Sequence, residues 1–364
     1  MEYEKIRLAE KAQELGDIEL AVLLCLVAEA HCIIEADVED IEQAEKEIQS
    51  ICHKTFGLTT ATLNCTADMS LDDFDAHILV YDAAEVVTPT ANQHIQEDYF
   101  SSSDAISKRT KMLGFEDDGK IADVIVARDL HLAPVEVQVQ ALELMRGKRV
   151  FTRRALYTAP KRFVLVALNT ADKGPKMMLH LNNHFSISHF YQHPDSSAAS
   201  DIFDHENTST RSNVRSRPSI PAFPRQSSGI NPFLPFFQKY EIDEIAKLSS
   251  RVKLHPDVRA YMHNIVVFMR MHRAVASGVT PHATRSLYSL TSALASLHGL
   301  DFITPSLVAL AVRKIYPHRL VIVKPEDEMS LQWGSELDAV REYLDGITAE
   351  DVIDDVLGMV ETPL

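Results

Sequence analysis

The chain has 364 residues, of which 46% are hydrophobic and 24% are charged, and its formal net charge is −16 at pH 7. This length is sufficient for two domains with a well-buried core. The excess of carboxylates argues against a broad nucleic-acid or anionic-membrane surface, because such surfaces need clustered Lys and Arg. The sequence shows no secretory pattern and no apolar run long enough to span a bilayer. We therefore expect a soluble, cytoplasmic protein without nucleic-acid or membrane partners.

A metal site is not expected either. Four cysteines lie in the first 65 residues without a CxxC pair, which is typical of reduced core thiols rather than a zinc site. Histidines recur at positions 180, 184, 189 and 193. This segment includes a predicted strand, in which such spacings do not share one face.

Predicted helices and strands alternate through the first half of the chain. A helix pair broken at Gly16-Asp17 comes first, and the next helices are predicted over 37–52, 71–84 and 134–145. Strands are predicted over 31–36, 59–65, 124–127, 148–155, 163–168 and 185–191. This alternation predicts an α/β fold with a parallel sheet, which we place in residues 1–193.

The composition changes near Pro194. Residues 194–231 are rich in Ser, Asn, Asp, Pro and Arg without an apolar period, and they predict a disordered insert. A helical domain is predicted over 232–324, and an acidic C-terminal tail over 325–364. The tail has apolar positions in 337–344 and 348–360 that are expected to dock weakly on the rest of the molecule.

Residues 254–320 form a compact helical unit with an ordered set of motifs. A helix that begins after His255-Pro256 carries apolar residues at helical spacing. Thr280-Pro281 and Thr304-Pro305 are typical starts of two further helices, because Thr caps a helix and Pro suits its first position. Gly299 supplies a stop between these two helices. This order of motifs resembles the lid of the magnesium-chelatase and MoxR-type AAA+ ATPases. The resemblance implies a P-loop-NTPase-like core followed by a small all-α lid, and it implies ATP and Mg²⁺ chemistry in active members.

The phosphate-binding loop of that family is absent here. Active loops need glycines, a lysine and a hydroxyl between a strand and a helix, so that backbone N–H groups and the lysine reach the phosphates. At the matching place this chain has Ala36 and then three carboxylates within four residues, Asp37, Glu39 and Asp40. These carboxylates suit the helix dipole and replace the anion that should bind there.

Other family positions are altered as well. The position that resembles the magnesium-holding Asp carries Arg128, and the position of the water-orienting Glu carries Asp129. Asn169 matches the polar sensor residue at the tip of a strand. We expect Asp129 and Asn169 to be vestigial catalytic residues. Asn169 is equally well explained by hydrogen bonding at the strand end.

Two further positions concern the neighbouring subunit and the lid. The family's Asp-Arg-Phe, whose Arg reaches the neighbouring subunit's nucleotide, appears here as Asn183-His184-Phe185. In the lid, His282 stands where an arginine is expected, and Arg285 lies one turn away. We expect neither the Asn183-His184-Phe185 segment nor the lid position at His282 and Arg285 to bind nucleotide in the way the family does.

Within the insert, Arg215 precedes Ser219 by four residues and Pro221 follows it by two. This pattern resembles a phosphoserine docking site for 14-3-3 adaptors, and phosphorylation of Ser219 would add about −1.5 to −2 of charge.

The sequence thus favours a catalytically degenerate AAA+ module without a cofactor, which acts as a scaffold or regulatory subunit beside a protein partner, such as an AAA+ oligomer. The alternative is a magnesium-chelatase-like ATPase that couples ATP hydrolysis to metal insertion or protein remodelling. A third hypothesis is a signalling adaptor that works through the Ser/Arg insert.

Overall fold

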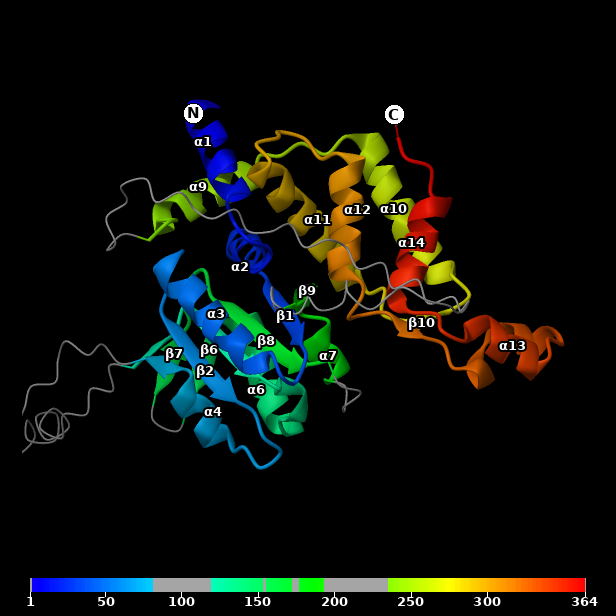
Figure 1. The fold of residues 1–364 in the computed structure, drawn as a ribbon, viewed down its shortest axis with the longest axis horizontal. Helices are drawn as coiled ribbons and strands as arrows, with labels where there is room; N and C mark the ends of the chain where they lie inside the picture. Colours follow the sequence, from blue (N-terminus) through cyan, green and yellow to red (C-terminus); the bar gives the residue numbers. More distant parts are fainter. Residues whose placement is uncertain (1, 81–118, 153–154, 172–176, 193–234, 364) are drawn as a thin grey trace, which may run out of the picture.

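The structure is a computed structural model that describes residues 2–80, 119–152, 155–171, 177–192 and 235–363 (Figure 1). The predicted insert over 194–231, including the candidate phosphosite Ser219, lies outside these residues. In the described part, an α/β body lies beside a group of helices, and the C-terminal segment follows on the far side of that group (Figure 1).

A five-stranded sheet forms the centre of the α/β body, in the order β2-β5-β8-β1-β9. All four strand pairings are parallel, as the alternation of elements predicts. The middle strands are apolar and buried, which is typical of parallel strands covered on both faces. The strand bounds are Thr60–Asn64 for β2, Val124–Arg128 for β5, Val164–Thr170 for β8, His31–Ala36 for β1 and Phe185–Phe190 for β9.

Helices cover both faces of the sheet. Cys32 and Ile34 of β1 belong to one cluster of buried residues, which we call the lid-side core, whereas Ile33 belongs to a second cluster, the far-side core. Adjacent residues divide in this way because side chains alternate across a strand. The lid-side core includes α2 (Asp17–Ala28) and α3 (Ile41–Lys54). The far-side core includes α4 (Leu71–His77) and α6 (Val135–Gly147).

Several predicted boundaries were wrong. Helix α3 begins at Ile41 rather than Asp37, since residues 38–40 form a turn. Helix α4 ends at His77 rather than near residue 84, and the short strand β3 (Leu79–Val80) follows, pairing with β4 (Lys120–Ile121). The single strand predicted over 148–155 is instead a hairpin of two three-residue strands, β6 (Arg149–Phe151) and β7 (Leu156–Thr158). Two short helices also occur, η2 (Leu130–Leu132) and α7 (Leu179–Asn182).

The helical domain follows the predicted starts closely. The side chains of Thr280 and Thr304 accept hydrogen bonds from the first turns of α11 and α12, and Pro occupies the first position of both helices. The bounds are Lys239–Ser249 for α9, Pro256–Met271 for α10, Pro281–Leu297 for α11 and Pro305–Ile315 for α12. A two-stranded antiparallel ribbon, β10 (Val275–Ser277) with β11 (Val321–Ile322), closes the domain.

The C-terminal segment folds back on this domain through α14 (Ala349–Met359), which contacts α10 and α12. Val352, Ile353 and Val356 of α14 are buried in the lid-side core, which shows that this docking is substantial. The remaining elements are η3 (Pro325–Asp327), η4 (Met329–Trp333) and α13 (Leu337–Leu344), which extends away from the body (Figure 1).

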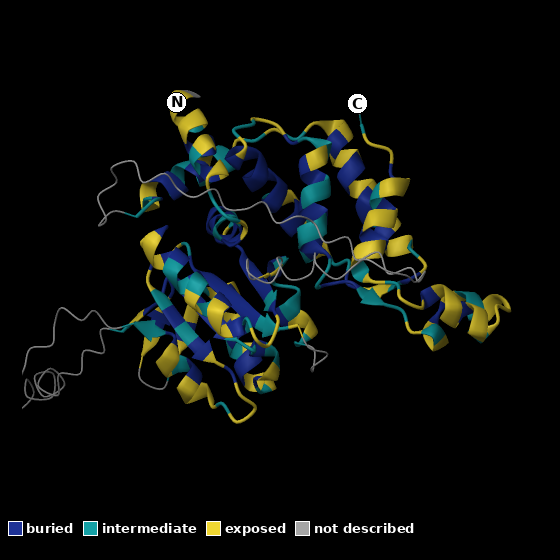
Figure 2. Cartoon of the chain, in the orientation of Figure 1, coloured by how far each residue is buried: buried dark blue, intermediate teal, exposed yellow. Residues whose placement is uncertain are grey.

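Both N-terminal helices pack on the helical domain. Helix α1 (Glu2–Gln13) contacts α9 and α11, where Arg7 and Lys11 pair with the buried Glu241 at 3.1 and 2.6 Å. Helix α2 contacts the same two helices and also β1 and β8. Buried residues therefore run continuously from the sheet through α2 into the helical domain (Figure 2).

Candidate functional site

The parallel strands bring several of the predicted positions to one edge of the sheet. Ala36, at the end of β1, lies in register with Thr170 of β8, and Arg128, at the end of β5, lies in register with Leu168. The turn after β1, Asp129 and Asn169 therefore meet at the carboxyl ends of the strands. We call this the carboxyl edge.

A short acidic turn joins β1 to α3 where the resemblance places the phosphate-binding loop. Residues 37–40 complete this connection, and the N–H of Asp40 donates to the carbonyl of Asp37 at 3.0 Å. Asp37 and Glu39 are exposed, and Asp40 is half-buried. A phosphate-binding loop wraps backbone N–H groups around the anion, whereas the N–H of Asp40 is used within the turn itself. Its carboxylates at the start of α3 would also repel a polyphosphate.

Arg128 places a cation at the carboxyl edge. Its guanidinium lies 4.0 Å from Glu42, 3.9 Å from Glu45 and 3.7 Å from Asp129. A guanidinium has only donors and does not ligate a metal ion. Arg128 thus partly neutralises these carboxylates at the position that the resemblance assigns to a magnesium-holding carboxylate.

Asp129 and Asn169 have structural contacts at this edge. Asp129 has a left-handed backbone (φ 52°), and its Oδ1 accepts from the N–H and the hydroxyl of Thr170, both at 3.2 Å. The Oδ1 of Asn169 lies 3.2 Å from Nδ1 of His131. These contacts join the ends of β5 and β8, so Asp129 and Asn169 lie at the same edge of the sheet.

The lid residues His282 and Arg285 lie at the opposite edge. They line a cavity with His31, the first residue of β1, and with His184, which directly precedes β9. Six strand residues separate this amino edge from the turn over 37–40, which is about 20 Å at 3.3 Å per residue. Within one chain, the lid residues and the acidic turn therefore do not form a common pocket.

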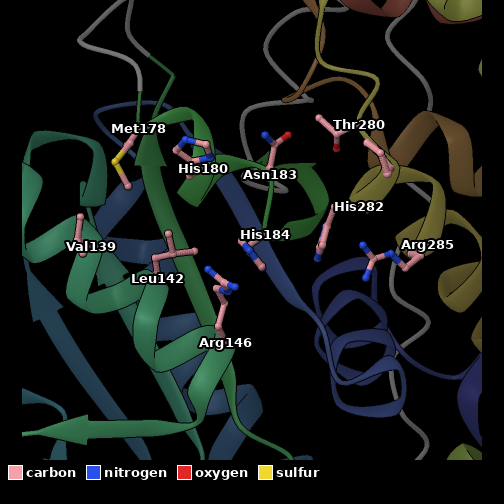
Figure 3. Close-up of a pocket in the computed structure, with 11 residues that line it drawn as sticks. Val139, Leu142, Arg146, Met178, His180, Asn183, His184, Thr280, His282 and Arg285 are labelled. Atoms are coloured by element: carbon pink, nitrogen blue, oxygen red, sulfur yellow. The ribbon is translucent and has the colours of Figure 1, made fainter.

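Two cavities of about 650 and 590 Å³ lie at the amino edge between α6, β9 and α11. Both are lined by Arg146, His184, His282 and Arg285, and Figure 3 shows these side chains gathered at the junction of the two domains. We call this the basic cleft.

Burial and mutual repulsion lower the pKa values of two histidines in the cleft, His184 and His282. The rings of His184 and His282 lie 4.5 Å apart. Burial, helped by His282 and Arg146, lowers the pKa of His184 to about 4. Burial, helped by Arg319 and Arg285, also lowers the pKa of His282. At neutral pH these two rings are therefore uncharged, and Arg146 and Arg285 supply positive charge to the cleft.

Sequence reasoning identified only part of this cleft. His184, His282 and Arg285 were singled out as altered family positions, but Arg146 and His31 were not given any role. Arg319, which adjoins the cleft, has no role in the sequence-based interpretation either. The signal that could have found them is basic residues at the end of α6 and after α12 in a strongly acidic chain.

No group of three or more His, Cys, Asp or Glu in the described ranges has an arrangement that could hold a metal ion. Among the helices that the structure describes, none is both long and apolar enough to cross a membrane.

Comparison with known proteins supports the lid and the fold. The family model of the AAA lid domain matches residues 267–340. A crystal structure of a candidate ATPase from Cytophaga hutchinsonii is similar over 100% of this chain and 96% of its own, with a TM-score of 0.63 and 12% identity. The fold is of the AAA+ type. At this identity the similarity to the Cytophaga protein concerns the fold alone.

Two curated relatives match a shorter part of the chain. Both are named maintenance of telomere capping protein 2. The one from Lachancea thermotolerans is 27% identical over 116 residues, which cover 30% of this chain and 41% of that protein. The one from Kluyveromyces lactis is 28% identical over 98 residues, which cover 26% of this chain and 36% of that protein. The match thus spans less than half of either relative.

Proposed function

We propose that this chain is a catalytically degenerate AAA+ module that serves as a scaffold or regulatory subunit and does not hydrolyse ATP. The observation that carries the proposal is the turn over 37–40, which is short, closed by its own hydrogen bond and acidic. Phosphoryl transfer depends on positioned charge, and loss of one such group typically costs about 10²–10³-fold in rate. Here the glycines, the lysine and the magnesium-holding carboxylate are all replaced.

The proposed partner is a protein. An AAA+ oligomer suits the retained core and lid, and a 14-3-3-type adaptor at Ser219 is the second proposed partner. Since two relatives are named for the maintenance of telomere capping, we extend the proposal to an assembly that protects chromosome ends. Such a role would place the protein in the nucleus for at least part of the time, in contrast to the cytoplasmic expectation.

The test is a phosphate-release assay of the full chain with Mg²⁺-ATP up to millimolar, with calorimetry in parallel. We expect no release, and we expect any heat of binding to be the same for the wild type and for Asp129→Asn. This substitution keeps the shape of the Asp129 side chain at the carboxyl edge but removes its negative charge.

Turnover that Asp129→Asn abolishes would contradict the proposal. It would favour the magnesium-chelatase-like ATPase, for which the similarity in fold to a candidate ATPase is the supporting observation.

A further inference from the structure

The basic cleft holds arginine charge that the described carboxylates do not balance. Arg146 belongs to the last turn of α6 and Arg285 to the first turns of α11. Both side chains are exposed, and no ion pair of the described ranges includes either guanidinium. Glu29 lines one of the cavities, but its carboxylate pairs with Lys148 at 2.7 Å. The cleft is therefore a positive site in a chain of net charge −16.

A buried arginine beside the cleft adds to this charge. Arg319 is 1% exposed, and its Nη2 donates to the carbonyls of Asn183 and Phe185 at 3.2 and 2.5 Å. Its Nε and Nη1 are buried without a hydrogen-bond partner among the described residues, and so is Nδ1 of His282. Burial lowers the pKa of Arg319 only to about 10, so it remains a cation at pH 7. Arg319 does not line either cavity, but its charge lies close to the cleft because Asn183, to which it donates, lines one of them. An anion bound in the cleft would therefore reduce the unfavourable energy of this buried charge.

The side chains that line the cleft indicate the chemistry of the remaining parts of a ligand. On one side lie the apolar side chains of Val139, Leu142 and Met178, and on the other the hydroxyl-bearing Ser186 and Ser286 (Figure 3 shows the apolar side). Thr280, Pro281 and His282 place the N-terminus of α11 at the cleft, where the helix dipole also favours an anion. Each cavity is in the size range of small-molecule sites.

We infer that the basic cleft binds a phosphorylated small molecule, with its phosphate held by Arg146 and Arg285 and its organic part packed on Val139 and Leu142. The planar guanidinium suits phosphate because it donates two parallel hydrogen bonds. Since Arg146 belongs to the α/β body and Arg285 to the helical domain, the ligand ties the two together. This site lies at the edge opposite the acidic turn, so it is independent of the proposed loss of ATP hydrolysis.

The test uses the full chain, with inorganic phosphate and phenyl phosphate as probes at constant ionic strength. Calorimetry is expected to show saturable binding of both, tighter for phenyl phosphate because its ring reaches the apolar wall. Arg146→Gln and Arg285→Gln are each expected to weaken binding about tenfold or more, since a hydrogen bond to a charged group contributes about 1.5–3 kcal/mol.

Arg259→Gln, at an exposed position of α10, is the matched control and should leave binding unchanged. Leu142→Ala should reduce the advantage of phenyl phosphate and leave the affinity for inorganic phosphate unchanged.

Three results would overturn the inference. The first is thermal stabilisation by phosphate that is equal in the wild type and all three arginine variants, because phosphate also stabilises proteins generally by exclusion from their surface. The second is equal affinity for the two probes, because it would show that no organic group packs on the apolar wall. The third is an absence of phosphate binding together with self-association that Arg285→Gln disrupts in sedimentation. That result would assign the cleft to protein carboxylates instead.

Discussion

His31 shows how one residue can couple the amino edge to pH. Its Nδ1 accepts a hydrogen bond from the N–H of Leu165 at 3.0 Å, inside the body of the protein. Burial, helped by His184 and Lys148, lowers the pKa of His31 to about 3. An unfolded chain has a His pKa of about 6.5. Between these values the unfolded state binds a proton that the folded state does not.

This difference predicts the sign of a pH effect on stability. The free energy of unfolding is at its full value above about pH 6.5, where His31 is neutral in both states. It falls as the pH decreases toward the pKa of His31 in the folded protein, by about 1.4 kcal/mol per pH unit for one histidine. His31→Asn offers an acceptor in place of Nδ1 but does not titrate. Between pH 6.5 and 4.5 its free energy of unfolding should fall by about 2 kcal/mol less than that of the wild type, measured by urea denaturation.

The control is His298→Asn at the exposed end of α11, which should follow the wild type at both pH values. A pH dependence of His31→Asn equal to that of the wild type would show that His31 titrates normally in the folded protein.

At the scale of elements, the connection that precedes α11 is the most constrained part of the lid. Gly278 has φ +114°, a conformation that L side chains rarely adopt. A Cβ added there would lie 2.1 Å from the carbonyl oxygen of Arg319. The chain before α11 and the chain before β11 therefore approach each other at a point where only hydrogen fits. This approach fixes the start of α11 beside the basic cleft.

Gly278→Ala should therefore destabilise the protein by at least about 2 kcal/mol, through backbone strain and a steric overlap that must be relieved. The measurement is the denaturation midpoint followed by circular dichroism. Gly358→Ala is the matched control, since Gly358 lies in α14 with no atom within 4 Å of the added Cβ. It should stabilise by about 0.5–1 kcal/mol, because Ala favours the helix. If Gly278→Ala left the stability unchanged, the segments that precede α11 and β11 would be able to move apart at little cost in free energy.

At the scale of the whole molecule, the α/β body and the helical domain share one core. Leu23 of α2 is fully buried in the lid-side core, which also contains residues of the sheet and of α9 to α12. Leu144 of α6 is fully buried in the far-side core, which packs on the other face of the same sheet. A fold joined in this way should unfold as one cooperative unit.

Differential scanning calorimetry is expected to show a single endotherm. Leu23→Ala and Leu144→Ala should each lower the free energy of unfolding by about 2–5 kcal/mol and move the endotherm without dividing it. If Leu144→Ala shifted only one of two resolved transitions, the helical domain would be an independent unit.

The sequence predicted most of the long elements because their patterns are periodic. Helices α10, α11 and α12 and strands β5 and β8 lie close to where apolar spacing, Thr-Pro starts and uncharged runs place them. The pairs β3–β4, β6–β7 and β10–β11 were missed or merged, because strands of two or three residues are too short to show a period. The residues of the carboxyl edge were named from the resemblance alone, and the parallel pairing of β1, β5 and β8 is what brings them to one edge.

The basic cleft could not be assembled from sequence in the same way. Arg146, His184 and Arg285 come from distant parts of the chain, and only the packing of the helical domain against α6 and β9 brings them together. The net charge of −16 also gives no sign of this cleft, because a total over the whole chain does not reveal a local group of arginines.

The packing of α2 against α9 and α11 has a consequence for biosynthesis. Residues 17–28 leave the ribosome long before residues 239–297, and at about 5–20 residues per second the interval is roughly ten seconds or more. During that time the largely apolar α2 has no lid to cover it, although its other contacts with the sheet can form. A nascent chain stalled before residue 239 should therefore be a chaperone substrate, and one extended beyond residue 297 should be released.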